Sequence, residues 1–142
     1  MRLTPDTNVL VLFVTGDDSG QAAVARRVLT EAESLVITVP TLCELVWVLR
    51  SVYQVSPPEV ARAVRALVAP SNVVVDRAAV AAGLALADVG GDFADGAIAA
   101  LGRSLGADEF VTFDRRAAKL LSAAGVPARL LGGRAEGART LQ

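Results

Sequence analysis

Short apolar runs alternate with longer amphipathic stretches along the chain. The runs are only a few residues long and are rich in β-branched or large apolar side chains, which is typical of buried strands. The predicted strands are 35–39, 72–75, 109–113 and 127–131, with a weaker candidate at 2–4. The amphipathic stretches predict helices at 20–33, 41–53, 57–69, 77–88, 93–105 and 115–124.

Capping residues support several of these helix boundaries. Ser56 precedes the helix at 57–69, and Pro57 stands in its first turn, where the missing N–H does no harm. Gly106 and Gly125 follow two other predicted helices as C-terminal stops. The alternation of elements is therefore delimited by local signals as well as by hydrophobicity.

Strands that alternate with helices through short connections predict an α/β fold. We expect a central, mainly parallel sheet of about four to five strands flanked by helices, in one domain that spans 1–131. The Gly-rich end, 132–142, is expected to be a flexible or partner-contacting tail. In this architecture ligands bind outside the carboxyl ends of the strands, so the residues at those junctions matter most.

Composition narrows the chemistry that these junctions can support. The 142 residues include no histidine, which excludes catalytic triads, histidine general bases and histidine metal sites. A single cysteine, Cys43, excludes a disulfide framework and suits a reducing cytoplasm. The net charge of −1 indicates no global basic field. No stretch approaches the ~20 apolar residues of a membrane span, so we expect a soluble, cytoplasmic protein with no membrane partner.

Acidic side chains lie at or near the starts of four expected helices. They are Asp6, Glu44, Asp95 (with Asp92 three residues earlier) and Asp114. Carboxylates crowded at one sheet edge repel and raise one another's pKa, so such a cluster is costly unless a cation occupies it. With no histidine available, the matching cation is a hard one, Mg²⁺ or Mn²⁺, which is suited to phosphate chemistry.

Each of these acids also has a simpler interpretation as a helix cap. Thr41 and Glu44 have the spacing of a capping box, and Asp114 stands directly before a predicted helix. Asp92 can cap the helix in which Asp95 complements the dipole. Against this, the apolar run behind Asp6 is expected to bury it, whereas caps are usually exposed. The set as a whole therefore favours a metal site.

Four segments in order make the chain resemble the PIN-domain family, most closely the toxin ribonucleases of bacterial type II toxin–antitoxin pairs. The segments are "DTNVL" (6–10), "PTLCELVWVL" (40–49), "DFADGAIAAL" (92–101) and "VTFDRRAAKLL" (111–121). The resemblance implies a Mg²⁺- or Mn²⁺-dependent endoribonuclease that hydrolyses RNA through a metal-activated water. Its catalytic and metal-site residues would be Asp6, Glu44, Asp95 and Asp114.

The resemblance also implies supporting residues and partners. Thr7, Asn8 and Thr112 would orient the carboxylates, and Asp92 would be a helper or a cap. The candidates for RNA phosphate contacts are Arg103, Arg115, Arg116 and Lys119, although surface arginines are commonly just solvated. A cognate antitoxin and a homodimer are the expected protein partners.

A protein-binding surface has one physical indication of its own. The expected helices at 8–14 and 41–53 carry more large apolar side chains than one small sheet face obviously uses: Phe13, Leu42, Trp47, Val48 and Tyr53. Most of these are expected to be ordinary core, and Trp47 is the candidate for a groove that binds a partner.

Pro5 departs from the family pattern, which usually has a small or branched apolar residue before the first aspartate. Proline cannot donate to a strand ladder. Either regular pairing stops near Thr4, or a carbonyl of the neighbouring strand lacks its partner. We expect Pro5→Val to raise the melting temperature without lowering Mn²⁺ affinity, and unchanged stability would show that the backbone there makes no ladder bond. A degenerate PIN module that binds RNA or protein without cleavage therefore stays open. A phosphatase with Asp6 as nucleophile is disfavoured because Asn8 stands where a second aspartate is expected.

Overall fold

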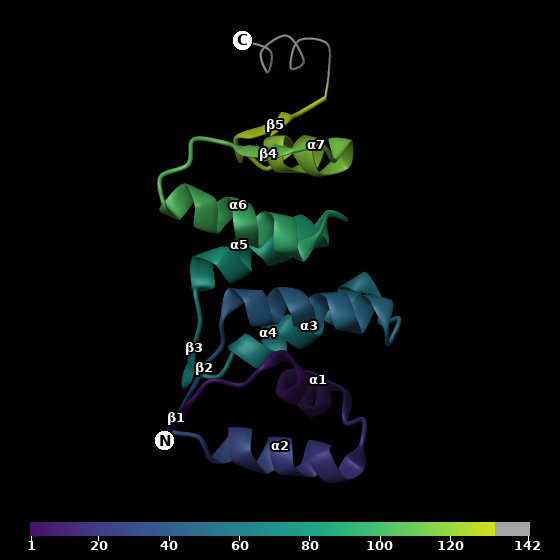
Figure 1. Ribbon diagram of the computed structural model, residues 1–142, viewed down its shortest axis with the longest axis vertical. Helices are drawn as coiled ribbons and strands as arrows, with labels where there is room; N and C mark the ends of the chain where they lie inside the picture. Colours follow the sequence, from purple (N-terminus) through teal and green to yellow (C-terminus); the bar gives the residue numbers. More distant parts are fainter. Residues whose placement is uncertain (133–142) are drawn as a thin grey trace. The chain divides into compact units, whose positions relative to one another are not determined.

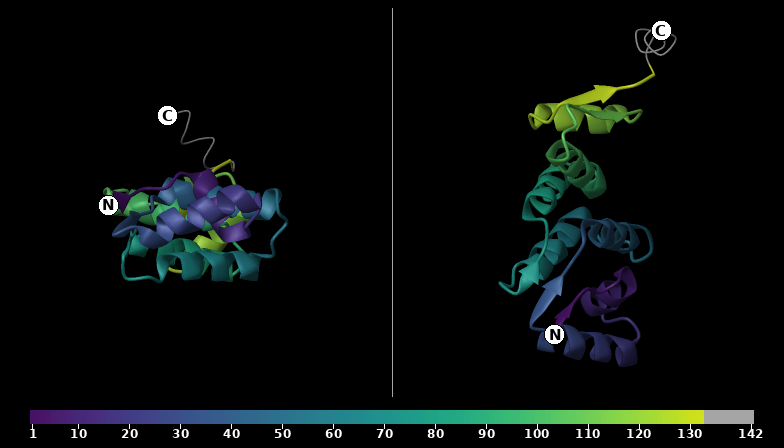
Figure 2. Two further views of the ribbon diagram at one scale, coloured as in Figure 1. Left: turned by 90° about the horizontal axis from the view of Figure 1, so that it is seen from below. Right: turned by 60° about the vertical axis from the view of Figure 1, so that its left-hand side comes forward.

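The computed structural model describes residues 1–132, so the expected tail at 132–142 lies outside the described residues except for Gly132. The chain divides into two compact units, Met1–Val80 and Ala81–Gln142. Helix α5 (Arg77–Asp88) contains the division between them. Strands and helices alternate in both units (Figures 1 and 2).

The first unit is built around a three-stranded parallel sheet. Its strands lie in the order β1-β2-β3, and Leu3 pairs with Leu35, which pairs in turn with Val73. The bounds of its elements are β1 Arg2–Leu3, α1 Thr7–Thr15, α2 Ser19–Glu31, β2 Ser34–Val36, α3 Val39–Ser51, α4 Pro57–Val68 and β3 Val73–Val74. Helix α1 packs against α2 and α3, and α3 packs against α4.

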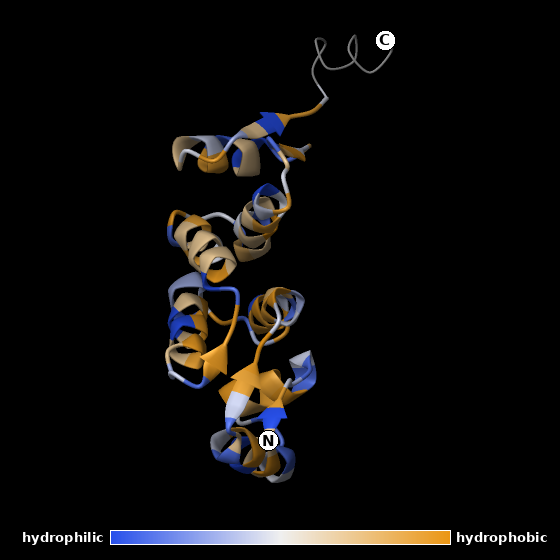
Figure 3. Cartoon of the chain, turned by 90° about the vertical axis from the view of Figure 1, so that its left-hand side faces the viewer, coloured by the Kyte–Doolittle hydropathy of each residue, from blue (hydrophilic) through white to orange (hydrophobic). Residues whose placement is uncertain are grey.

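Leucines from the helices form most of the core of the first unit. The largest side chains that are fully buried there are Leu10, Ile37, Leu42, Leu45, Leu49 and Val64. Each contributes about 1.5–3 kcal/mol relative to an exposed position. Strands β2 and β3 end in the apolar residues Val36 and Val74 (Figure 3).

The second unit pairs two strands and packs α7 against them. It contains most of α5, then α6 (Phe93–Ser104), β4 (Phe110–Thr112), α7 (Arg115–Ala123) and β5 (Ala128–Leu130). Strands β4 and β5 are parallel, with Val111 opposite Arg129. Leu86, Ala99 and Leu121 form a buried cluster against which Phe110 and Leu120 pack.

The α/β class and the parallel pairing are confirmed, and all five predicted strands are present. The strands are shorter than predicted and pair as a three-stranded and a two-stranded sheet. The strand predicted at 35–39 ends at Val36 because α3 begins at Val39, two residues earlier than predicted. Pro40 allows this early start, since a helix's first turn needs no N–H donor from it.

The pairing of β1 ends before Pro5, which settles the question that this residue raised. Strand β1 stops at Leu3, and the Thr4 hydroxyl donates to the Val36 carbonyl at 2.7 Å. That carbonyl of β2 therefore has a donor although proline offers none. The Pro5 side chain is buried. In the sequence Pro5 stands between β1 and α1, outside the paired strand residues. The fold tolerates proline here because it needs no backbone N–H at this position.

Two side chains, Arg77 and Tyr53, tie segments of the first unit together by hydrogen bonds. Arg77 donates to the carbonyls of Val68 and Val73, at 3.1 and 3.0 Å, and so connects the end of α4 to β3. The Tyr53 hydroxyl donates to the Asp17 carboxylate at 2.9 Å. This bond to a carboxylate raises the pKa of Tyr53 above its ordinary value. The hydrophobic pattern of the sequence predicts neither the Arg77 contacts nor the contact between Tyr53 and Asp17.

Candidate functional site

Asp6 stands between β1 and α1 and is the N-cap of α1. Its Oδ1 accepts a hydrogen bond from the Val9 amide at 3.0 Å. The side chain is exposed, so the expectation that the following apolar run buries it is wrong. The run is helical and turns Leu10 and Val11 inward, while its first turn stays at the surface. Burial therefore does not separate Asp6 from an ordinary cap.

Glu44 lies beside the first residue of α1 rather than in a capping box. The Thr7 hydroxyl donates to its Oε2 at 2.7 Å, across 37 positions of sequence. Glu44 is in the second turn of α3, because the helix begins at Val39, and the Thr41 hydroxyl is paired with that of Thr38 at 2.8 Å. The capping-box interpretation is therefore wrong. Thr7 thus contacts the Glu44 carboxylate, and the next residue, Asn8, is exposed.

The second unit brings three further carboxylates to the N-terminal ends of two helices. Asp92 caps α6 by accepting from the Ala94 amide at 3.1 Å, and Asp114 caps α7 by accepting from the Ala117 amide at 3.1 Å. Asp95 lies half-buried in the first turn of α6. Helix N-termini favour negative charge, so both helix dipoles stabilise this group.

The three acids interact electrostatically. Partial burial raises the pKa of Asp95 above its ordinary value, and the negative charges of Asp92 and Asp114 raise it further. We call Asp92, Asp95 and Asp114 the second-unit carboxylates. Their mutual repulsion is relieved by a proton on Asp95 or by a cation.

The donor chemistry suits a hard cation, but the described residues do not gather the acids into a metal-binding group. Carboxylate and hydroxyl oxygens are the ligands that Mg²⁺ and Mn²⁺ prefer. Among residues 1–132, however, no three Asp, Glu, Cys or His side chains form a group that could hold a metal ion. The second-unit carboxylates are thus close enough to repel one another without converging on one point.

Thr112 and Arg116 make contacts that sequence reasoning did not anticipate. The Thr112 hydroxyl accepts from the Asp114 amide at 3.0 Å, so it holds the backbone of Asp114 rather than its carboxylate. Arg116 Nη2 donates to the Gly90 carbonyl at 3.1 Å. The Arg116 guanidinium is therefore engaged within the chain. Arg115 and Lys119 are exposed on the same helix.

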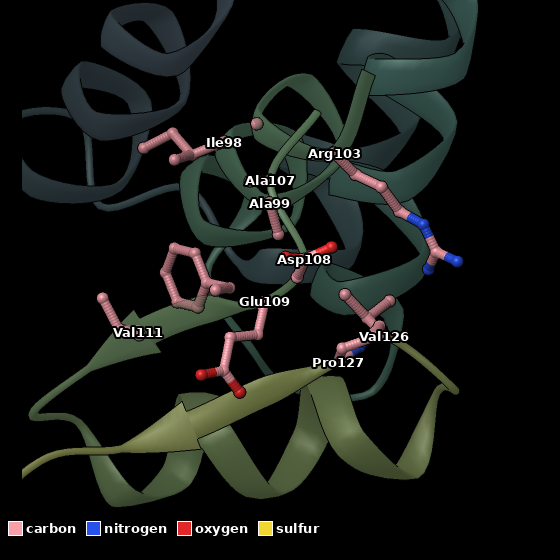
Figure 4. Close-up of a pocket in the computed structure, with 11 residues that line it drawn as sticks. Ile98, Ala99, Arg103, Ala107, Asp108, Glu109, Val111, Val126 and Pro127 are labelled. Atoms are coloured by element: carbon pink, nitrogen blue, oxygen red, sulfur yellow. The ribbon is translucent and has the colours of Figure 1, made fainter. Parts of the chain in front are cut away.

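Arg103 is separated from the carboxylates. It lies in the last turn of α6, about 12 Å along the helix axis from Asp95. There it lines a pocket of about 240 Å³, together with Asp108, Glu109 and apolar side chains (Figure 4). This pocket adjoins the amino ends of β4 and β5, whereas Asp114 follows the carboxyl end of β4. The pocket is consequently not the place where the acids gather.

The five side chains suspected of forming a partner surface differ in exposure. Leu42 is fully buried, and Phe13, Val48 and Tyr53 are half-buried. Trp47 has 66% of its surface exposed, which is high for so large an apolar side chain. Among the described residues no helix is both long and apolar enough to cross a bilayer.

Comparison with known proteins identifies the family. The PIN domain family model matches residues 3–121, which include every acid discussed above. No curated protein matches the chain significantly. PIN domains are generally metal-dependent nucleases that typically bind divalent metals. Because the match covers more than half of the sequence and runs through both units, the chain belongs to the PIN domain family.

Proposed function

We propose that this protein is a Mg²⁺- or Mn²⁺-dependent endoribonuclease that acts as the toxin of a toxin–antitoxin pair. The observation that carries the proposal is the state of Asp95. Burial and two neighbouring carboxylates raise its pKa in a protein of a nuclease family, an arrangement that a divalent cation would relieve.

Four acids are the proposed ligands. Asp6, Glu44, Asp95 and Asp114 would hold the cation, and Asp92 would assist or remain a cap. When bound, the cation lowers the pKa of a water and neutralises charge on the phosphate. Thr7 holds Glu44 in place through its hydroxyl, and Thr112 does the same for the backbone of Asp114. A carboxylate of this set accepts the proton of the attacking water.

Exposed basic side chains on α7 are the best candidates to bind RNA. Arg115 and Lys119 are solvent-accessible and follow Asp114 directly. Contacts with phosphates position the substrate without reading its sequence, and they make binding salt-dependent. Arg103 is less suitable because it stands at the far end of α6.

The proposed protein partners are a cognate antitoxin and a second copy of the chain. Exposed Trp47 supports a protein-binding surface on α3, since large aromatic side chains are enriched at such surfaces. A cytoplasmic location accords with the single reduced cysteine, Cys43.

Cleavage of RNA with added Mn²⁺ tests the proposal. Wild-type protein is assayed with and without EDTA beside Asp95→Asn, and Asp108→Asn is the matched control because Asp108 is an exposed acid near the pocket. We expect EDTA and Asp95→Asn each to abolish cleavage and Asp108→Asn to leave it unchanged. Cleavage that persists through EDTA and Asp95→Asn would exclude a metal nuclease.

A PIN module that binds RNA without cleaving it is the second candidate. It is favoured by the finding that, among residues 1–132, no three Asp, Glu, Cys or His side chains form a group that could hold a metal ion. RNA binding in an anisotropy assay, with no cleavage at any Mn²⁺ concentration, would select this candidate.

A further inference from the structure

A double-glycine turn between α5 and α6 is held by side chains from α7. The turn consists of Gly90 and Gly91, whose amides donate to the carbonyls of Ala87 at 3.0 Å and Leu86 at 2.9 Å. Arg116 Nη2 donates to the outward carbonyl of Gly90 at 3.1 Å. Since a backbone carbonyl at such a turn has no helical partner, the guanidinium satisfies it directly.

A side chain at either glycine would displace its neighbours. Gly90 has φ of +90°, and a Cβ there would lie 2.6 Å from Arg116 Nη2. A Cβ on Gly91 would lie 2.6 Å from Leu86 Cγ and 3.2 Å from Leu120 Cδ1. Arg116 and Leu120 are one helical turn apart, so a single face of α7 grips the turn. The absence of side chains at both positions lets α7 approach.

The hydrogen bond from Arg116 to Gly90 connects the two helix ends at which the second-unit carboxylates lie. Gly90 lies two residues before Asp92, the cap of α6, and Arg116 lies two residues after Asp114, the cap of α7. A hydrogen bond between residues 90 and 116 therefore restrains both helix N-termini at once.

We propose that Arg116 is a positioning residue, which sets the separation between Asp92 and Asp114 through its bond to Gly90. This inference rests on the proposed function, because it assigns the purpose of that separation to cation binding. It replaces the expectation that Arg116 contacts RNA. The side chain is exposed, as are those of Arg115 and Lys119, but it has a defined acceptor within the protein.

The test compares Arg116→Met and Arg116→Lys with Arg115→Met on the same helix. Mn²⁺ affinity is measured by titration calorimetry, cleavage is separated into kcat and KM, and RNA binding is measured in EDTA over a range of salt. Arg116→Met is expected to weaken Mn²⁺ binding at least about tenfold, as removal of a group that orients ligands commonly does. It should lower kcat with little change in KM and leave the salt dependence of RNA binding unchanged.

The other two variants define the alternatives. Arg116→Lys should recover part of the Mn²⁺ affinity, because an ammonium can donate to the Gly90 carbonyl. Arg115→Met should weaken RNA binding and reduce its salt slope by about one, without altering Mn²⁺ affinity. If Arg116→Met behaves like Arg115→Met instead, Arg116 contacts phosphate and the inference is overturned.

Amide hydrogen exchange in EDTA separates failure of the inference from failure of the proposed function. Arg116→Met should accelerate exchange at Gly90 and Gly91 about tenfold over wild type, and Lys119→Met should not. If wild-type protein neither binds Mn²⁺ nor cleaves RNA, the proposed function fails while this exchange result still decides whether Arg116 holds the turn. Unchanged exchange in Arg116→Met contradicts the inference in either case.

Discussion

Asp95 differs from the other candidate acids in its surroundings. Asp6, Asp92 and Asp114 each accept a backbone amide as a helix cap, which a carboxylate does without cost at the surface. Asp95 is half-buried among like charges, and these conditions raise its pKa. At the scale of single residues, therefore, Asp95 is the candidate acid whose ionised form lowers the stability of the folded protein.

Replacing Asp95 with asparagine should stabilise the metal-free protein at neutral pH. Because the pKa is higher in the folded state than in the unfolded state, the ionised carboxylate destabilises the fold, and this penalty is complete above the folded pKa. The gain from Asp95→Asn is expected to stay below about 1 kcal/mol, since the group is partly solvated. It should shrink as pH falls through the raised pKa and vanish below the ordinary value of 3.8.

Urea unfolding in EDTA at neutral and acidic pH measures this difference. Asp108→Asn, at an exposed loop position, provides the control and should give no pH-dependent gain. A lower unfolding free energy for Asp95→Asn at neutral pH would show that the carboxylate is stabilising and that its surroundings are not those described.

Pro5→Val should leave the melting temperature unchanged or slightly lower, not raise it. The strand has already ended at Leu3, and the Val36 carbonyl is bonded to the Thr4 hydroxyl, so a new N–H at position 5 gains no ladder bond. Loss of proline costs up to about 1 kcal/mol by freeing the unfolded chain. Thermal unfolding followed by circular dichroism tests this, with Thr4→Val expected to cost about 0.5–1.5 kcal/mol. An increase in melting temperature for Pro5→Val would mean that the N–H finds a partner after all.

At the scale of elements, the start of α6 depends on how α7 packs. Helix α6 begins only after a tight turn that brings Asp92 into capping position, and this turn lies under Arg116 and Leu120. Helix α7 packs against the short β4–β5 pair. Its side chains Arg116 and Leu120 contact the glycine turn before α6. The placement of the second-unit carboxylates is thus a property of several elements together.

Gly90→Ala should destabilise the protein more than Gly106→Ala. Both glycines have positive φ, +90° and +106°, so both substitutions carry the backbone strain of about 1–3 kcal/mol. A Cβ at position 106 meets nothing within 4 Å, whereas one at position 90 meets Arg116 at 2.6 Å. Chemical unfolding of the two variants provides the comparison. Equal losses would indicate that Arg116 does not press on the turn.

At the scale of the whole molecule, the family match spans two compact units that each supply part of the proposed ligand set. Asp6 and Glu44 belong to the first unit, and the second-unit carboxylates to the other. A cation that binds only the folded protein would stabilise it, because ligand binding to the folded state alone shifts the unfolding equilibrium.

Mn²⁺ should therefore raise the unfolding free energy of the wild-type protein. At a free concentration one hundred times its Kd, the expected increase is about 2.7 kcal/mol. EDTA should reverse it, and Asp95→Asn should show little of it. Thermal unfolding across a Mn²⁺ series gives the measurement. An equal shift in Asp95→Asn would place cation binding elsewhere on the protein.

The sequence by itself determined the α/β class, the succession of elements and the position of the five candidate acids near helix starts. It could do so because hydrophobic periodicity and capping residues are local properties. It could not determine that α3 begins at Val39, that Asp6 is exposed or that Thr7 binds Glu44. Those facts depend on which side of a helix faces its neighbours. Only the tertiary structure joined Arg116 to Gly90 across 26 residues, since a side chain's bond to a distant carbonyl leaves no periodic trace in the sequence.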